Sequence, residues 1–148
     1  MGKNLLSLIV VFTLFGCSKG GSMAKQPPVT ACGDSPNCVS TEDRRAKYQL
    51  APLSLASTDI AFTTIVEKIA AMPRAEVVSA QDNYAHLRFT TQVLRFVDDV
   101  EVSLNGDQVA LRSASRVGYY DFGANRRRAD AIRRTLVEAE LVTPADVR

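Results

Sequence analysis

The stretch RFVDDVEVSLNGDQVALR, residues 95–112, decides the fold that the sequence predicts. Asn105 and Gly106 lie near its centre, and both residue types tolerate the positive φ angles that a two-residue type I′ turn requires. Apolar and polar residues alternate on both sides of this pair, which is typical of antiparallel strands with one buried face. With these two residues in the turn, the hairpin predicts that Asp99 lies opposite Arg112.

The sequence on either side of this hairpin predicts the remaining elements. Alternation of apolar and polar residues indicates strands, and apolar residues at helical spacing indicate helices. The predicted strands cover 75–80, 84–90 and 95–104, with a fourth after Gly106, and the predicted helices cover 59–72 and 121–139. This order predicts an α+β fold (αββββα), a four-stranded antiparallel meander sheet with two helices packed on one face and its polar face open.

Each helix is predicted from one apolar stripe. In the first helix, Ser57 or Thr58 is the expected N-cap, and Pro73 ends the helix. Both stripes are expected to face the sheet. They consist of Phe62, Ile65, Val66 and Ile69 in the first helix and of Ala129, Ile132, Leu136 and Ala139 in the second.

The N-terminal residues are typical of a bacterial export signal. Lys3 precedes an apolar run over residues 5–15, and a helix of about eleven residues spans only about 16 Å of a bilayer core about 30 Å thick. A transmembrane anchor is therefore not expected. The run ends at Leu14-Phe15-Gly16-Cys17, which resembles the lipobox of bacterial lipoproteins. This resemblance implies that residues 1–16 are a signal peptide and that Cys17 is acylated, whereas the alternative is an ordinary signal peptide that ends at a chance cysteine.

Ser18 follows this cysteine and is similar to the residues that permit sorting of lipoproteins to the outer membrane. The expected location is therefore the cell envelope, lipid-anchored at the outer membrane through Cys17 and facing the periplasm. Residues 17–30 contain glycine and proline pairs and few large apolar residues, which predicts a flexible tether. Residues 31–148 are then expected to form a single globular domain that begins with an irregular arm.

If Cys17 is acylated, Cys32 and Cys38 remain as a pair. A disulfide between them is expected in an oxidising periplasm. A metal or redox role would be better served by the tighter Cys-x-x-Cys spacing, but it stays open as an alternative. The arm before the first helix is therefore predicted to carry a disulfide.

Composition weakens the case for several kinds of partner. The chain has 18 basic and 16 acidic residues, a net charge of +2, so its overall charge predicts no nucleic-acid partner. It has one histidine, and the adjacent Asp98 and Asp99 would point to opposite faces of a strand, so no metal or other cofactor is expected. Asp98 is expected to point inward near Ser113 as a hydrogen-bonded structural acid.

Three separated motifs resemble one protein family. They are Cys32-Gly-Asp-Ser-Pro-Asn-Cys-Val-Ser-Thr41, Phe96-Val-Asp-Asp-Val-Glu101, and Arg112-Ser-Ala-Ser-Arg-Val-Gly118 followed by Asp121, Gly123, Asn125 and Arg126. In this order they are similar to the domain of unknown function 1499 family, over nearly the whole chain that follows the predicted signal peptide. The resemblance implies no reaction, ligand or catalytic residue, because the family itself has no assigned function.

Arginines near the start of the second helix indicate a candidate anion site. Cations in the first turn of a helix oppose the helix dipole, at a cost of about 0.3–1 kcal/mol each, which favours a specific role for them. Backbone amides at a helix N-terminus and guanidinium groups both bind carboxylate or phosphate well. The candidate ligand-binding residues are Arg112, Arg116, Gly118, Asn125 and Arg126. The alternative is structural, with Arg126 paired to Asp130 or holding Asp98 or Asp99.

A second candidate site lies on the polar face of the predicted sheet. If Thr90 pairs with Arg95, His86 falls opposite Asp99, and Glu101 lies diagonal to this pair. His86 with Asp99 or Glu101 could serve a periplasmic hydrolase or isomerase, but an ordinary charged ladder explains the same residues. The sequence offers many arginines and no activated nucleophile. It therefore favours a non-enzymatic module that binds an anionic small molecule, a lipid or an envelope protein.

Overall fold

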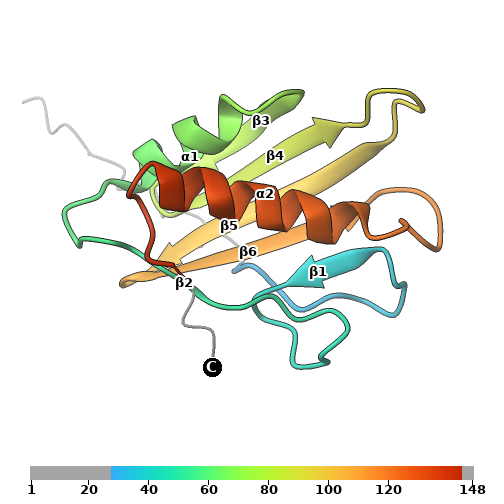
Figure 1. Ribbon diagram of the computed structural model, residues 1–148, viewed down its shortest axis with the longest axis horizontal. Coiled ribbons are helices and arrows are strands. Elements are labelled where there is room, and N and C mark those ends of the chain that lie inside the picture. Colours follow the sequence, from blue (N-terminus) through green and yellow to red (C-terminus); the bar gives the residue numbers. More distant parts are fainter. Residues whose placement is uncertain (1–27, 145–148) are drawn as a thin grey trace, which may run out of the picture.

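The computed structural model describes residues 28–144 of the 148-residue chain (Figure 1). The predicted signal peptide, Cys17 and most of the predicted tether lie outside the described residues. Two helices and an antiparallel sheet make the fold α+β, as the sequence predicts. The elements in chain order are β1 (Cys38–Ser40), β2 (Leu53–Ser54), α1 (Phe62–Ala70), β3 (Ala75–Gln81), β4 (Tyr84–Thr90), β5 (Val97–Asn105), β6 (Gln108–Ser115) and α2 (Ala124–Glu138).

The sheet has six strands rather than the four predicted, in the order β1-β6-β5-β4-β3, and β2 also pairs with β6. The two additional strands come from the arm that the sequence predicts to be irregular. β1 lies antiparallel to β6, with Val39 opposite Ser113, and all three of its residues are buried. β1 and β2 thereby pair with backbone groups on the outer edge of β6, which would otherwise be exposed. Strands of three and two residues are too short to show the alternation on which a strand prediction depends.

The β5–β6 hairpin differs from its predicted register. Its turn begins at Gly106, one residue later than expected, and Asn105 is the last residue of β5. Gly106 has a φ of 62°, and glycine at the first central position is typical of a type II′ turn. Arg112 therefore lies opposite Glu101 and not opposite Asp99. Because the register differs by two residues, every side chain keeps its predicted face of the sheet.

The β4–β5 connection is also longer than the predicted register requires. Thr90 pairs with Val97 rather than with Arg95. Arg95 instead lies in the loop, with a φ of 55° in the left-handed region. As a consequence, Asp99 lies diagonal to His86 rather than opposite it.

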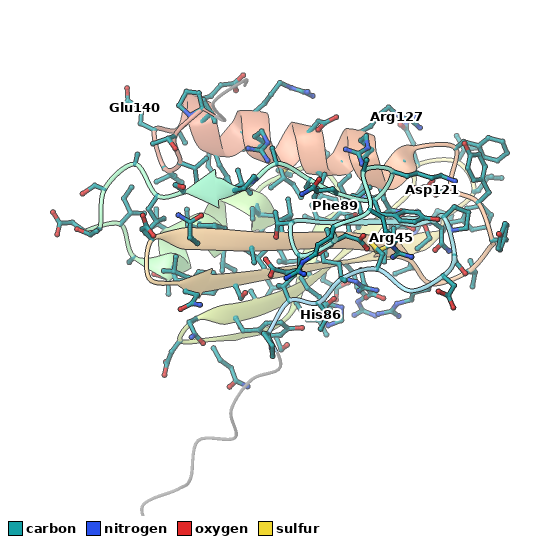
Figure 2. The ribbon with its side chains drawn as sticks, turned by 90° about the horizontal axis from the view of Figure 1, so that it is seen from below. Arg45, His86, Phe89, Asp121, Arg127 and Glu140 are labelled. Carbon is teal, nitrogen blue, oxygen red and sulfur yellow. A yellow bond between two sulfur atoms is a disulfide. The ribbon has the colours of Figure 1, made fainter. Side chains whose placement is uncertain are left out.

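One main apolar cluster joins both helices to the strands. The predicted stripes supply the buried apolar residues of α1 and α2, although Ala139 lies beyond the end of α2 and the polar Asn125 is also buried. Phe89 of β4 faces α2, where the guanidinium of Arg128 lies 5.4 Å from its ring centre, whereas His86 points to the opposite side of the sheet (Figure 2). Burying one large apolar side chain contributes about 1.5–3 kcal/mol, so this shared cluster is the main source of stability.

Both helices begin later than the sequence predicts. α1 begins at Phe62 without a side-chain N-cap, and the Ser57 hydroxyl instead accepts a hydrogen bond of 3.3 Å from the backbone N–H of Asp59 in the preceding turn. α2 begins after Asp121, whose carboxylate accepts a hydrogen bond of 2.8 Å from the backbone N–H of Asn125. Among residues 28–144, neither helix has the length and apolar character needed to cross a membrane.

The arm before α1 is held in place by a disulfide and an ion pair. Cys32 and Cys38 form the predicted disulfide. The buried carboxylate of Asp43 accepts hydrogen bonds from the Arg45 side chain and from the backbone N–H of Cys32. The hydrogen bonds from Arg45 hold the pKa of Asp43 well below its ordinary value, although burial opposes this shift. Arg45 also donates to the carbonyls of Cys32 and Gly33, so the arm has a defined structure.

Candidate binding site

Two loops enclose an apolar groove at one end of the sheet. One loop, residues 91–96, connects β4 to β5, and the other, residues 116–123, connects β6 to α2. The groove between them has a volume of about 650 Å³, and small-molecule sites typically measure about 300–1,000 Å³. Its apolar lining consists of Val93, Leu94, Phe96, Val117, Tyr120 and Phe122. These six side chains are between 49% and 85% exposed, and an exposed apolar cluster of this kind is typical of a binding surface.

Hydrogen bonds close the 91–96 loop at its base. The backbone N–H of Thr91 donates to the carbonyl of Phe96 at 2.8 Å, and the N–H of Phe96 donates to the Thr91 hydroxyl oxygen at 2.9 Å. The left-handed conformation of Arg95 turns the chain back toward β5. The loop therefore holds Val93 and Leu94 beyond the end of the sheet.

The 116–123 loop is fastened both to the arm and to α2. The side-chain amide of Asn37, beside the disulfide, donates to the carbonyl of Gly118, whose φ of 87° is readily adopted only by glycine. Asn125 of α2 donates from its own side-chain amide to the carbonyl of Asn37 at 2.8 Å. Near the other end of the loop, Arg127 donates to the carbonyl of Phe122 at 2.8 Å. The disulfide-bearing arm therefore helps to fix one wall of the groove.

A buried polar network lies beneath the groove. Asp98 and Ser115 line the groove, and the carboxylate of Asp98 pairs with the guanidinium of Arg128 from α2. Arg128 also donates to the side-chain oxygen of Asn125 at 2.8 Å, and the Asn125 amide donates to the Ser115 hydroxyl oxygen at 2.9 Å. Asp98 is buried and hydrogen-bonded, as the sequence predicts, and its arginine partner is Arg128 rather than Arg126.

Asp121 borders both the groove and the start of α2. One carboxylate oxygen accepts a hydrogen bond of 3.0 Å from the N–H of Gly123, and the other accepts the backbone and side-chain N–H groups of Asn125, both at 2.8 Å. Burial would raise the pKa of Asp121, but these hydrogen bonds outweigh burial and lower it. A negative charge before a helix is also stabilised by the helix dipole. Asp121 therefore shapes the loop that forms the groove wall.

Two groups of charged residues lie on the face of the sheet to which His86 points. Glu101 is at the centre of the first group. Its carboxylate accepts a hydrogen bond of 2.9 Å from the Tyr84 hydroxyl and another of 2.6 Å from Arg112. Burial is the main cause that raises the pKa of Tyr84, and the hydrogen bond to Glu101 raises it further. The side chains of Glu101 and Arg112 are each 23% exposed, so this pair is partly withdrawn from water.

Asp99 is the centre of the second group. Its carboxylate lies 2.6 Å from His86 Nε2 and accepts two hydrogen bonds of 2.8 Å from the guanidinium of Arg116. Burial would raise the pKa of Asp99, but the hydrogen bonds from Arg116 and His86 lower it. The sequence-predicted residues His86, Asp99 and Glu101 therefore share one face of the sheet, in two separate groups.

The structure does not gather the five residues of the predicted anion site. Arg112 and Arg116 are each held by a carboxylate on one face of the sheet, whereas Asn125 is buried on the side of α2. Gly118 uses its carbonyl to bind the arm. Arg126 donates to two backbone carbonyls of the arm, both at 3.0 Å, and so fastens the arm to α2.

Sequence reasoning misses the groove. Its six apolar residues lie mainly in connecting segments, where they follow neither helical nor alternating spacing. The signal available was their density, because residues 91–96 and 116–123 contain several large apolar side chains without a periodic pattern. Connecting segments usually run over the surface, so apolar residues concentrated there indicate an exposed apolar patch.

The two sites offer different chemistry. The groove combines apolar surface with a hydroxyl group and an ion-paired carboxylate at its floor, and so it suits a ligand with an apolar part. The charged face offers carboxylates and arginines that already bind one another. Within the part of the chain that the structure describes, no group of three or more His, Cys, Asp or Glu side chains could hold a metal ion.

Comparison with known proteins identifies a family. Neither the curated proteins nor the solved structures provide a match to this chain. A family model described as "Protein of unknown function (DUF1499)" matches residues 28–136, which extend from the arm through the whole sheet into α2. The match covers well over half of the chain, and the chain therefore belongs to the DUF1499 family.

Proposed function

We propose that this chain is a lipid-anchored envelope protein and a non-enzymatic binding module, and that its groove holds the apolar part of a lipid. The main support is the groove of about 650 Å³ with its six exposed apolar side chains. A ligand that covers these side chains removes apolar surface from water, which contributes about 25 cal/mol for each Å². Acylation of Cys17 would keep such a module close to membrane lipids.

The polar groups beside the groove favour a ligand with an uncharged head group. The charge of Asp98 is already balanced by Arg128, and the carboxylate of Asp121 binds the start of α2. An anionic head group close to Asp121, whose charge no arginine balances among the described residues, would be repelled. The Ser115 hydroxyl oxygen accepts a hydrogen bond from Asn125 and can donate its own proton to a ligand. Of the ligand classes that the sequence suggests, the groove therefore favours a lipid over an anionic small molecule.

The charged face of the sheet contributes less to the proposed function than the groove does. We infer that both helices cover one face of the sheet and that the face with Arg112 and Arg116 stays open to the periplasm. Each arginine already has a carboxylate partner, Glu101 or Asp99. An anionic envelope partner would have to displace these ion pairs before it could bind there.

Binding of a pyrene-labelled monoacylglycerol by the purified chain tests the groove. Phe96→Ala should weaken binding about 10-fold or more, because loss of a large apolar contact removes about 1.5–3 kcal/mol. Val77→Ala is the matched control, because Val77 is 41% exposed against 49% for Phe96 but lies on the edge strand β3. Equal affinities of the two variants would contradict groove binding, once thermal unfolding shows that both are folded.

A second probe tests the preference for an uncharged head group. A pyrene-labelled fatty acid of the same chain length carries a carboxylate at pH 8, and it should bind more weakly than the monoacylglycerol. Asp121→Asn should reduce this difference, because it removes the carboxylate beside the groove that is not balanced by an arginine. Tighter binding of the fatty acid to the unmodified chain would contradict the assignment of an uncharged head group.

The lipid anchor is tested separately, in cells. Incorporation of labelled palmitate should be lost in Cys17→Ser and retained in Cys32→Ser, and the labelled protein should fractionate with the outer membrane. Labelling that persists in Cys17→Ser would contradict the anchor without affecting the groove.

A second candidate function is hydrolysis or isomerisation by His86 with Asp99 or Glu101. The contact of 2.6 Å between His86 and Asp99 favours it, since a carboxylate can orient a histidine that acts as a general base. Two observations argue against it. Asp99 also accepts two hydrogen bonds from the Arg116 guanidinium, and His86 does not line the groove. Any turnover found with candidate substrates should disappear in His86→Ala, and turnover that survives would remove this function.

A further inference from the structure

The two groove loops expose large apolar side chains to solvent, and one of these side chains lies outside the groove lining. Val93, Tyr119 and Phe122 are 85%, 74% and 80% exposed, the highest values among the large apolar residues of the described chain. Tyr119 does not line the groove, so a ligand held in the groove would leave it uncovered. A contiguous apolar surface of this kind indicates contact with a larger partner.

Two exposed residues in these loops have left-handed backbone. Phe122 has a φ of 53°, and Arg95 has a φ of 55°, both in the left-handed region that residues with a side chain rarely adopt. The ring of Phe122 packs edge-on against that of Tyr120 at a centroid distance of 5.1 Å, and both remain largely exposed. These exposed rings are covered little by the rest of the protein, which favours their contact with a partner.

Cationic groups border this apolar surface. Arg95 lies within the 91–96 loop, Arg74 donates from Nε to the carbonyl of Thr90 at the base of that loop, and Arg127 donates to the carbonyl of Phe122. All three arginines are exposed, and none of them forms a salt bridge among residues 28–144. Neither loop contributes an acidic residue before Asp121, which is bound to the start of α2. The border of the apolar surface is therefore positively charged.

Apolar and aromatic tips with a cationic border fit the chemistry of an anionic phospholipid surface. Tyr and other aromatic side chains favour the interface between head groups and acyl chains. Arginines beside them attract anionic head groups, within the short range that physiological salt allows. We propose that Val93, Leu94, Tyr119, Tyr120 and Phe122, with Arg74, Arg95 and Arg127, form a docking surface for an anionic phospholipid bilayer. This docking surface goes beyond the proposed function, since it binds the bilayer itself rather than a single ligand molecule.

The absence of tryptophan from the chain allows a direct test. Tyr119→Trp places one fluorophore on the docking surface but outside the groove lining, and Gln108→Trp places one at the opposite end of β6, also at an exposed and uncharged position. Both full-length proteins are reconstituted on vesicles of phosphatidylglycerol or of phosphatidylcholine that contain brominated acyl chains. Because any N-terminal anchor is the same in both proteins, a difference between the two fluorophores reports the orientation of the fold.

In phosphatidylglycerol vesicles, the Tyr119→Trp fluorescence should shift to shorter wavelength and be quenched at least threefold more than that of Gln108→Trp. Adding Arg74→Gln, Arg95→Gln and Arg127→Gln should remove most of this excess, and phosphatidylcholine vesicles should show little of it. Equal quenching of the two fluorophores, or equal quenching by the two lipids, would overturn the docking surface. A blue shift that rises with protein concentration without vesicles would also overturn it, because the partner would then be a second copy of the chain.

Monomeric lipid binding in the groove is measured without vesicles, so the two proposals can fail independently. Thermal unfolding of each variant shows whether a lost signal reflects a lost fold.

Discussion

The carboxylate of Asp98 in β5 and the guanidinium of Arg128 in α2 form an ion pair beneath the groove, with side chains that are only 3% and 11% exposed. The same guanidinium lies over the ring of Phe89 in β4 and donates to the Ser113 hydroxyl oxygen in β6, so it connects the helix to the sheet through three different contacts. A charge that is buried to this extent destabilises the folded protein unless an opposite charge lies beside it.

Arg128→Met should lower the free energy of unfolding by about 3–5 kcal/mol, because it leaves the carboxylate of Asp98 buried without a counter-charge. Urea denaturation measures this loss. Glu76→Gln is the control, since it breaks the exposed pair of Glu76 with Arg88 and should change stability by less than about 1 kcal/mol. Similar effects of the two variants would show that the Asp98–Arg128 pair is not specially important.

Stability should decline in acid because three carboxyl groups, Asp43, Asp99 and Asp121, have pKa values below their ordinary value of 3.8. A lowered pKa in the folded state means that the stabilisation is complete above the pKa of the unfolded chain and is lost as pH falls through the folded values. The melting temperature should therefore change little between pH 7 and pH 5 and fall progressively below about pH 4. Asp43→Asn should melt lower at pH 7 and lose less on acidification, and an unchanged acid response would contradict its assigned contribution.

Reduction of the Cys32–Cys38 disulfide should lower stability by about 2 kcal/mol, as expected for a short closed loop. The measurement is the melting temperature with and without dithiothreitol. The double variant Cys32→Ser/Cys38→Ser should melt at the lower temperature in both conditions. If reductant lowers its melting temperature as much as that of the unmodified chain, the effect does not come from this disulfide.

Arg112→Ala should lower stability by about 1–2 kcal/mol, because Glu101 then keeps only the hydrogen bond from Tyr84. Combined with Arg126→Ala, it also tests the anion site that the sequence predicts. Since each arginine already binds groups within the protein, titration with inorganic phosphate should give the same heat before and after both substitutions. Phosphate binding that is present in the unmodified chain and lost in this variant would instead support an anion site.

The face of each strand residue could be predicted from the sequence, but its partner across the sheet could not. Alternation assigns Ala85, Leu87 and Phe89 to the buried side, and all three are buried. The Asn105-Gly106 pair, in contrast, fits a turn that begins at either residue, and local chemistry alone does not decide between them. Both hairpin registers differ from prediction by two residues, which preserves the faces and changes every pair.

The groove and the two short strands depend on contacts between distant parts of the chain. β1 forms because its three residues pair with β6, where Val39 lies opposite Ser113. The three residues of β1 alone do not indicate this distant partner. The groove likewise combines apolar residues from two loops that only the sheet brings together. His86 and Asp99 were expected to be neighbours, and they do meet, although across a diagonal rather than directly.

The side-chain amide of Asn37 connects the groove to residues far away in sequence, because it binds the carbonyl of Gly118, 81 positions along the chain. Anything that spreads the 116–123 loop must stretch or break this hydrogen bond. The nitrogen-15 resonance of that amide is thus a built-in reporter, which should move when the groove fills although Asn37 itself does not line it. Occupancy of the groove can therefore be followed by nuclear magnetic resonance without attaching a probe to the ligand or the protein.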